Sequence, residues 1–140
     1  MLSTARPASF SHAETVPASK VMLWSGRVIS GLIVSFLLFD AIIKVIKLAP
    51  AVEATTRLGY PVSVLVPIGI ALLVSTVLYA IPRTAMLGAI LLTGYLGGAT
   101  ATQVRVGDPW LLLPVVFGVL LWAGLFLRDV RLRALIPLRR

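Results

Sequence analysis

The sequence predicts an all-α fold, namely a polytopic membrane protein built as an antiparallel four-helix transmembrane bundle. Three observations support this fold class. Of the 140 residues, 59% are hydrophobic and 13% are charged, whereas soluble domains are about half apolar and a quarter charged. The apolar residues gather in four stretches that each reach the roughly 20 residues needed to cross a bilayer. Two of the three connections between these stretches are so short that neighbouring helices must run in opposite directions.

The first predicted span covers about residues 23–47 and is the only one interrupted by charged side chains, Asp40 and Lys44. Residues 1–20 are rich in Ser, Ala, Thr and Pro and have no apolar periodicity. We expect them to form a disordered cytoplasmic tail, because the apolar stretch that follows is too long for a signal peptide and has no cleavage site after it. Residues 21–140 then form a single membrane domain.

Spans two to four contain no Asp, Glu, Lys or Arg and cover about residues 61–81, 84–104 and 109–127. We expect helices, because backbone groups in lipid must be hydrogen-bonded within their own segment, and four strands cannot close a barrel. The longer first connection, residues 48–60, has Glu53 four residues before Arg57. This spacing favours a short helix at the membrane surface.

The positions of Lys and Arg indicate the orientation, because these residues are enriched in cytoplasmic loops. With the N-terminus inside, nine of the 13 basic residues lie on the cytoplasmic side: Arg6, Lys20, Arg27, Arg83, Arg128, Arg131, Arg133, Arg139 and Arg140. The opposite side has the other four, Lys44, Lys47, Arg57 and Arg105. We therefore expect a multi-pass protein of the cell membrane with both termini in the cytoplasm.

A candidate polar site lies near the outer end of the first span. Asp40 and Lys44 are four residues apart and share one face of the helix. An unpaired charge in lipid is costly, so we expect them to pair with each other or with Arg105 and Asp108 of the outer loop. Two interpretations stay open, a proton or substrate site and a structural clamp between the first span and its neighbours.

The third span is rich in small residues. Gly94 and Gly98 form a GxxxG pair and Gly97 lies beside them, which predicts a face for close helix packing. A second interpretation is a flat face that admits a planar ring, with Tyr95 or Gln103 supplying hydrogen bonds.

The composition argues against several kinds of chemistry. The chain has no cysteine and one histidine, so we expect neither a bound metal nor a covalently attached cofactor. No nucleotide or catalytic motif is present, which favours a non-enzymatic role. The net charge of +8 is spread between apolar segments and explained by topology, so the expected partner is the lipid bilayer and not nucleic acid.

Several segments of the sequence resemble the DoxX-like family of small bacterial four-span membrane proteins. They are residues 40–44 (DAIIK), 58–61 (LGYP), 79–84 (YAIPRT), 88–99 (GAILLTGYLGGA), 105–109 (RVGDP) and 122–129 (WAGLFLRD). The resemblance extends from about residue 24 to residue 140 and implies a four-helix fold. It also implies a link to sulfur or quinone-linked oxidoreductase complexes, to which some relatives belong. Gln103 departs from the family pattern, in which a histidine is frequent at this position.

Three functional hypotheses follow from the residues and the resemblance. The first is a non-enzymatic accessory or quinone-interacting subunit of a membrane redox complex, with a quinone or a lipid as ligand and a membrane or redox protein as partner. The second is a small proton-coupled transporter that uses Asp40, with a homo-oligomer forming the pathway. The third is a membrane assembly factor or chaperone that contacts other membrane segments through the small-residue face of the third span.

Overall fold

A computed structural model describes residues 20–135 of the chain. Most of these residues are helical. The elements are α1 (Lys20–Val45), α2 (Ala49–Arg57), the 3-10 helix η1 (Val62–Val64), α3 (Leu65–Ala80), α4 (Ala85–Val106), the 3-10 helix η2 (Pro109–Leu111), α5 (Leu112–Arg128) and α6 (Val130–Leu135). The tail predicted for residues 1–20 lies outside the described part except for Lys20, which begins α1. Arg139 and Arg140 lie outside it as well.

The predicted fold class is confirmed. Within residues 20–135, four helices are long and apolar enough to cross a membrane, and they span Lys20–Val45, Val62–Ala80, Ala85–Val106 and Pro109–Arg128. Each lies within about three residues of the corresponding predicted span. The short surface helix expected in the first connection is present as α2.

We call the end of the bundle that contains the connections after α1 and after α4 the outer end, and the opposite end the inner end. Two helix ends show why the connections at the outer end begin where they do. After α1, Lys47 adopts a left-handed conformation with φ of 53°, and the Leu48 N–H donates to the Ile43 carbonyl over 3.0 Å. After α4, Gly107 does the same with φ of 68°, and the Asp108 N–H donates to the Gln103 carbonyl over 3.0 Å. Both are Schellman ends, which satisfy the last helix carbonyls and turn the chain sharply.

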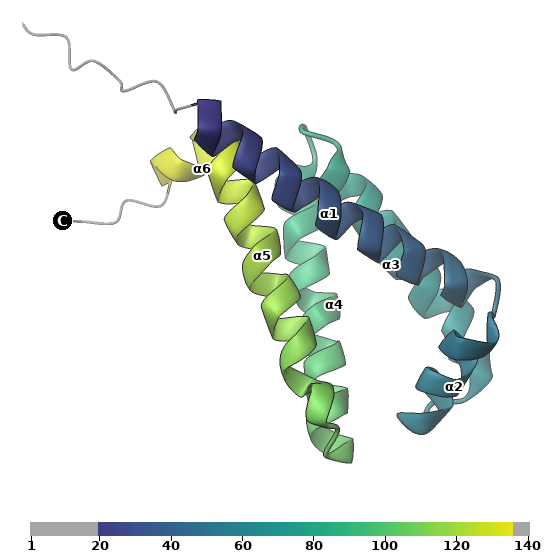
Figure 1. Ribbon diagram of the computed structural model, residues 1–140. Coiled ribbons are helices and arrows are strands. Elements are labelled where there is room, and N and C mark those ends of the chain that lie inside the picture. The colour runs from purple at the N-terminus through teal and green to yellow at the C-terminus, as the bar shows by residue number, and fades with distance from the viewer. Residues whose placement is uncertain (1–19, 136–140) are drawn as a thin grey trace, which may run out of the picture.

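The four long helices form a ring in the order α1, α3, α4, α5, so that α1 lies diagonally opposite α4 (Figure 1). No Cα atoms of α1 and α4 lie within 8 Å of each other in the described structure. The core between the helices is built mainly from aliphatic side chains, together with one aromatic residue, Tyr79, which is fully buried.

Tyr79 connects the helices at the inner end of the ring, where the membrane interior offers no water for hydrogen bonds. Its hydroxyl donates to the Leu121 carbonyl over 2.7 Å and lies 3.2 Å from the Ser30 hydroxyl. The Arg128 guanidinium donates to the Tyr79 carbonyl over 2.9 Å and lies over the Tyr79 ring. These contacts connect α1, α3 and α5 and leave every polar group among them with a partner, which the bilayer interior requires.

Glycines decide where α1 touches its neighbours. A Cβ on Gly26 would stand 2.9 Å from the Arg128 nitrogen and from the Leu127 Cβ, so α1 and α5 are in near backbone contact at the inner end. At the outer end, a Cβ on Gly69 of α3 would stand 2.9 Å from the Lys44 Cβ. Helix α1 therefore packs closely against α5 at the inner end and against α3 at the outer end. Toward the outer end, α1 and α5 diverge (Figure 1).

A Gly26→Ala substitution tests the inner crossing. The added methyl group meets backbone atoms of α5 that cannot turn away, so we expect a loss of about 1–3 kcal/mol in the free energy of unfolding. Gly31→Ala is the matched control, because Gly31 lies on the same helix and its added Cβ would have no described atom of another element within 4 Å. Unfolding in mixed detergent and SDS micelles, followed by circular dichroism, measures both. Equal stability of the two variants would contradict the proposed crossing.

Candidate functional site

The separation of α1 from α5 leaves a cavity of about 640 Å³ at the outer end of the bundle. We call it the outer cavity. It is lined mainly by α1, α2, α4 and α5, with side chains that include Phe36, Lys44, Thr55, Tyr95, Gln103 and Phe117. Most of the lining is apolar, and the few polar side chains lie on α1, α2 and α4 and in the connection after α2. Small-molecule sites in proteins have this size and this composition.

The inner boundary of the outer cavity is an aromatic pair. The rings of Phe36 from α1 and Phe117 from α5 are stacked, with centroids 4.6 Å apart and planes inclined by 17°. Phe36 and Phe117 are the innermost lining residues of α1 and α5. The cavity starts beyond this pair and extends toward the outer surface.

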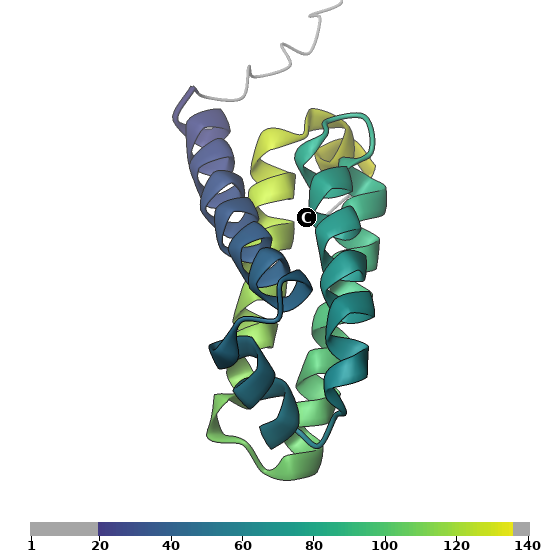
Figure 2. The ribbon, with the colours of Figure 1, turned by 90° about the vertical axis from the view of Figure 1, so that its right-hand side faces the viewer.

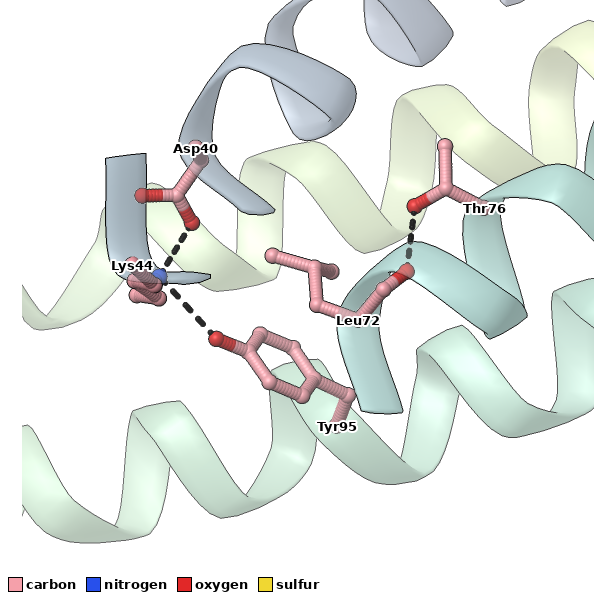
Figure 3. Close-up of polar contacts among 5 residues, drawn as sticks. All are labelled: Asp40, Lys44, Leu72, Thr76 and Tyr95. Carbon is pink, nitrogen blue, oxygen red and sulfur yellow. Dashed lines mark hydrogen bonds and ion pairs between the residues drawn. The ribbon is translucent and has the colours of Figure 1, made fainter. Parts of the chain in front are cut away.

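The principal polar group of the cavity is formed by three side chains. Lys44 and Asp40 form an ion pair within α1, and the Lys44 ammonium also donates to the Tyr95 hydroxyl on α4 over 3.1 Å (Figure 3). The side chains of Lys44 and Asp40 are 17% and 29% exposed. This cluster bridges α1 and α4, whose backbones do not touch, and it places an ammonium and a phenol at the cavity wall.

Helix α2 lies at the outer end of the bundle (Figure 2), and residues of α2 and of the connection after it line the cavity there. Ala51 and Thr55 are the buried residues of α2 and point into the bundle. The Leu58 carbonyl after α2 accepts a hydrogen bond of 2.9 Å from the Arg105 guanidinium, which holds this connection to the end of α4. The Tyr60 and Thr102 hydroxyls lie 3.0 Å apart and make a second link between the same segments.

The Gln103 side chain has an unmet hydrogen-bonding group. Its amide oxygen Oε1 is buried and has no hydrogen-bond partner among the described residues. Gln103 lines the outer cavity near the C-terminal end of α4, two turns beyond Tyr95. A buried acceptor without a donor is rare in proteins and calls for a specific explanation.

Comparison with known proteins assigns the family. The model of the DoxX-like family matches residues 28–124. The chain belongs to the DoxX-like family. No curated protein and no solved structure matches the chain. The part of this DoxX-like chain that matches the family contains every residue that lines the outer cavity, from Phe36 to Phe117.

The structure brings together some of the predicted site residues of this DoxX-like protein and separates others. Asp40 and Lys44 pair with each other, and Tyr95 joins them. Arg105 instead contacts the Leu58 carbonyl. Asp108 accepts a hydrogen bond of 2.9 Å from the Trp110 N–H and thereby begins η2, so it takes no part in the cluster.

The small-residue face of α4 meets no other helix of the same chain. At Gly94, Gly97 and Gly98 an added Cβ would have no described atom of another element within 4 Å. Gly94 and Gly98 line the outer cavity, and Gly97 is exposed outside it. Close packing within the chain occurs at Gly26, Gly69, Gly88 and Gly124 instead, so a packing role for the three α4 glycines remains a prediction about a second chain.

Several cavity residues were not singled out by sequence analysis. Phe36 and Phe117 are unremarkable apolar residues in their spans, and nothing in the sequence indicates that they stack. Tyr60 and Thr102 are also joined only by the fold. Helix α2 did carry a signal, because Ala51 and Thr55 are small residues four positions apart and therefore share one helix face.

A double-mutant cycle tests the Asp40–Lys44 pair. Lys44→Met leaves Asp40 as an unbalanced charge at the edge of the bilayer, and we expect it to lower the free energy of unfolding by up to about 3 kcal/mol. Adding Asp40→Asn should recover part of this loss, because the unpaired charge is removed. Lys47→Met serves as the control, since Lys47 is exposed beyond the helix end. Strictly additive effects of the two substitutions would show that the pair makes no net contribution.

Proposed function

We propose that this DoxX-like protein binds a flat, membrane-soluble ring molecule of the quinone type in the outer cavity, as a non-enzymatic subunit of a membrane redox complex. The observation that carries the proposal is the lining of the cavity. An apolar space of about 640 Å³ is lined by the Lys44 ammonium on α1 and by the Tyr95 phenol and the Gln103 amide on α4. Apolar walls with a few directed polar groups suit a ring that carries oxygen atoms.

The shape of the cavity also supports a flat ligand. Gly94 and Gly98 present bare backbone to the cavity, so a ring can approach this side of α4 closely. The stacked pair of Phe36 and Phe117 offers a second aromatic surface at the inner boundary. Aromatic rings prefer offset stacking or edge contacts with such side chains, and these contacts add to the gain from apolar burial.

The residues of the chain favour an accessory role. The sequence has no cysteine and one histidine, so it offers few ligands for a redox metal of its own. A subunit that holds a membrane-soluble quinone next to a redox partner needs no redox metal of its own. Lys44 balances the charge of Asp40, which is why we propose ligand binding ahead of proton-coupled transport through Asp40. The exposed glycine face around Gly97 is available to a partner helix or to a second copy of the chain.

Filling the cavity should abolish binding. Gly98→Leu places an isobutyl group in the outer cavity, and we expect the affinity for a decyl-substituted benzoquinone to fall about tenfold or more. Isothermal titration calorimetry in lipid nanodiscs measures the affinity. Gly97→Leu is the matched control, because it adds the same side chain to the same helix outside the cavity. Absence of binding to the unsubstituted protein, or an equal loss in both variants, would contradict the proposal.

We also propose that the protein lies in the cell membrane with both termini in the cytoplasm. The basic residues of the described structure support this orientation. Lys20, Arg27, Arg83 and the basic residues of α5 and α6 lie toward one end of the bundle, whereas Lys44, Lys47, Arg57 and Arg105 lie toward the other. The outer cavity then opens toward the outer leaflet.

Single cysteines report this orientation directly, because the chain has no cysteine of its own. A membrane-impermeant maleimide should label Glu53→Cys on α2 in intact spheroplasts. It should label Ala134→Cys on α6 only after the membrane is disrupted. Both positions are exposed, so burial in the protein does not limit either reaction. Labelling of Ala134→Cys in intact spheroplasts would overturn the orientation.

A further inference from the structure

The outer cavity has hydrogen-bonding groups at two places along α4. Tyr95 and Gln103 are separated by eight residues, which corresponds to about 12 Å of backbone along the helix axis. The α4 residues that line the cavity between them are Leu96, Gly98, Ala99 and Thr102. A ring with an oxygen at each end can present one oxygen toward Tyr95 and the other toward Gln103.

The group around Tyr95 can donate hydrogen bonds to a ligand. The Tyr95 oxygen accepts from the Lys44 ammonium, and its own O–H proton has no acceptor among the residues that the structure describes. Lys44 uses its contacts to Asp40 and Tyr95 for two of its three N–H groups. One N–H and one O–H therefore remain for an oxygen of the ligand, which acts as acceptor at this end.

Gln103 has the opposite requirement. Its buried Oε1 needs a hydrogen-bond donor, and none of the described residues supplies one. A purely apolar ligand would not supply one either. A ligand hydroxyl at this end of the cavity would provide the donor. A ligand carbonyl would not, because a carbonyl has no hydrogen to give, and the buried oxygen would stay unpaired.

We propose that Gln103 is a specificity-determining residue that selects a ligand with a ring hydroxyl, and hence the reduced, para-dihydroxy form of a quinone over its oxidised form. The hydroxyl nearer Tyr95 accepts from Tyr95 or Lys44, and the hydroxyl at the other end donates to Gln103 Oε1. The oxidised form has only acceptors, so it leaves Gln103 Oε1 without a donor. This inference rests on the proposed function, because it concerns which form of the ring the same cavity holds.

The experiment compares three probes that share one ring and tail. They are decyl-substituted benzoquinone, its reduced form kept under anaerobic dithionite, and the dimethyl ether of the reduced form, which has no O–H and is stable in air. Affinities are measured by calorimetry for the full-length protein in nanodiscs. We expect the reduced form to bind about tenfold more tightly than the other two, which should bind alike.

Two variants of Gln103 make the assignment specific. Gln103→Met has a similar length and no hydrogen-bonding group, and we expect it to lose the preference for the reduced form. Gln103→Glu, measured at pH 8, keeps the acceptor oxygen and loses the amide N–H, and we expect it to retain the preference. Circular dichroism of each variant confirms that the bundle is folded before binding is compared.

The results separate the two proposals. Equal binding of all three probes to the wild-type protein would overturn the role of Gln103 and leave ligand binding in the cavity intact. An unchanged preference in Gln103→Met, or its loss in Gln103→Glu, would also overturn that role. If none of the probes binds to the wild-type protein, the proposed function fails together with this inference.

Discussion

The crossing of α1 over its two neighbours is the constraint on which the rest of the structure depends. In lipid, apolar side chains gain nothing by leaving the solvent, so helices associate where small residues allow close van der Waals contact. Gly26 and Gly124 provide such a contact between α1 and α5 at the inner end, and Gly69 provides one between α1 and α3 at the outer end. A straight helix that satisfies both contacts must leave α5 as it approaches the outer surface. The cavity is the consequence of this geometry.

The polar groups follow from the same crossing. Where α1 is packed tightly, the side chains of Ser30, Tyr79 and Arg128 form hydrogen bonds with one another or with backbone carbonyls, so the helices are closely joined there. Where α1 has moved away, Lys44 reaches across the ring to Tyr95. The hydrogen bond between Lys44 and Tyr95 thus connects α1 and α4, whose backbones are not in contact. A structural clamp and a ligand-binding group are therefore compatible roles for the same cluster.

The fold class was predictable because hydropathy and length are local properties, and three spans contain no charge. The partners of particular residues were not. The GxxxG pair of Gly94 and Gly98 is the most obvious packing signal in the sequence, yet both residues face the cavity. The glycines that do pack are isolated in sequence, and a single glycine in an apolar span gives no indication of which helix it meets.

The candidate site was predictable in part for a related reason. Asp40 and Lys44 are four residues apart on one helix, so their pairing is visible in the sequence. Contacts to Arg105, Asp108 or Tyr95 depend on how far each loop and helix extends into space. At the end of α4 the Gln103 carbonyl accepts from the Asp108 N–H, and the Asp108 carboxylate accepts from the Trp110 N–H. These local hydrogen bonds occupy the Asp108 side chain but leave the Gln103 side chain available to the cavity.

The charge balance of the outer cavity limits what it can hold. Asp40 and Lys44 are the two charged residues in the described lining, and they neutralise each other. An anionic or cationic ligand would bring an uncompensated charge into a low-dielectric region, at a cost that a few neutral hydrogen bonds do not offset. A neutral ligand leaves the balance intact and still meets an ammonium, which is a stronger hydrogen-bond donor than any uncharged group. Asp40 thus allows Lys44 to serve as a charged donor within a cavity that has no net charge, and this combination favours a neutral, oxygen-bearing molecule that arrives from the membrane.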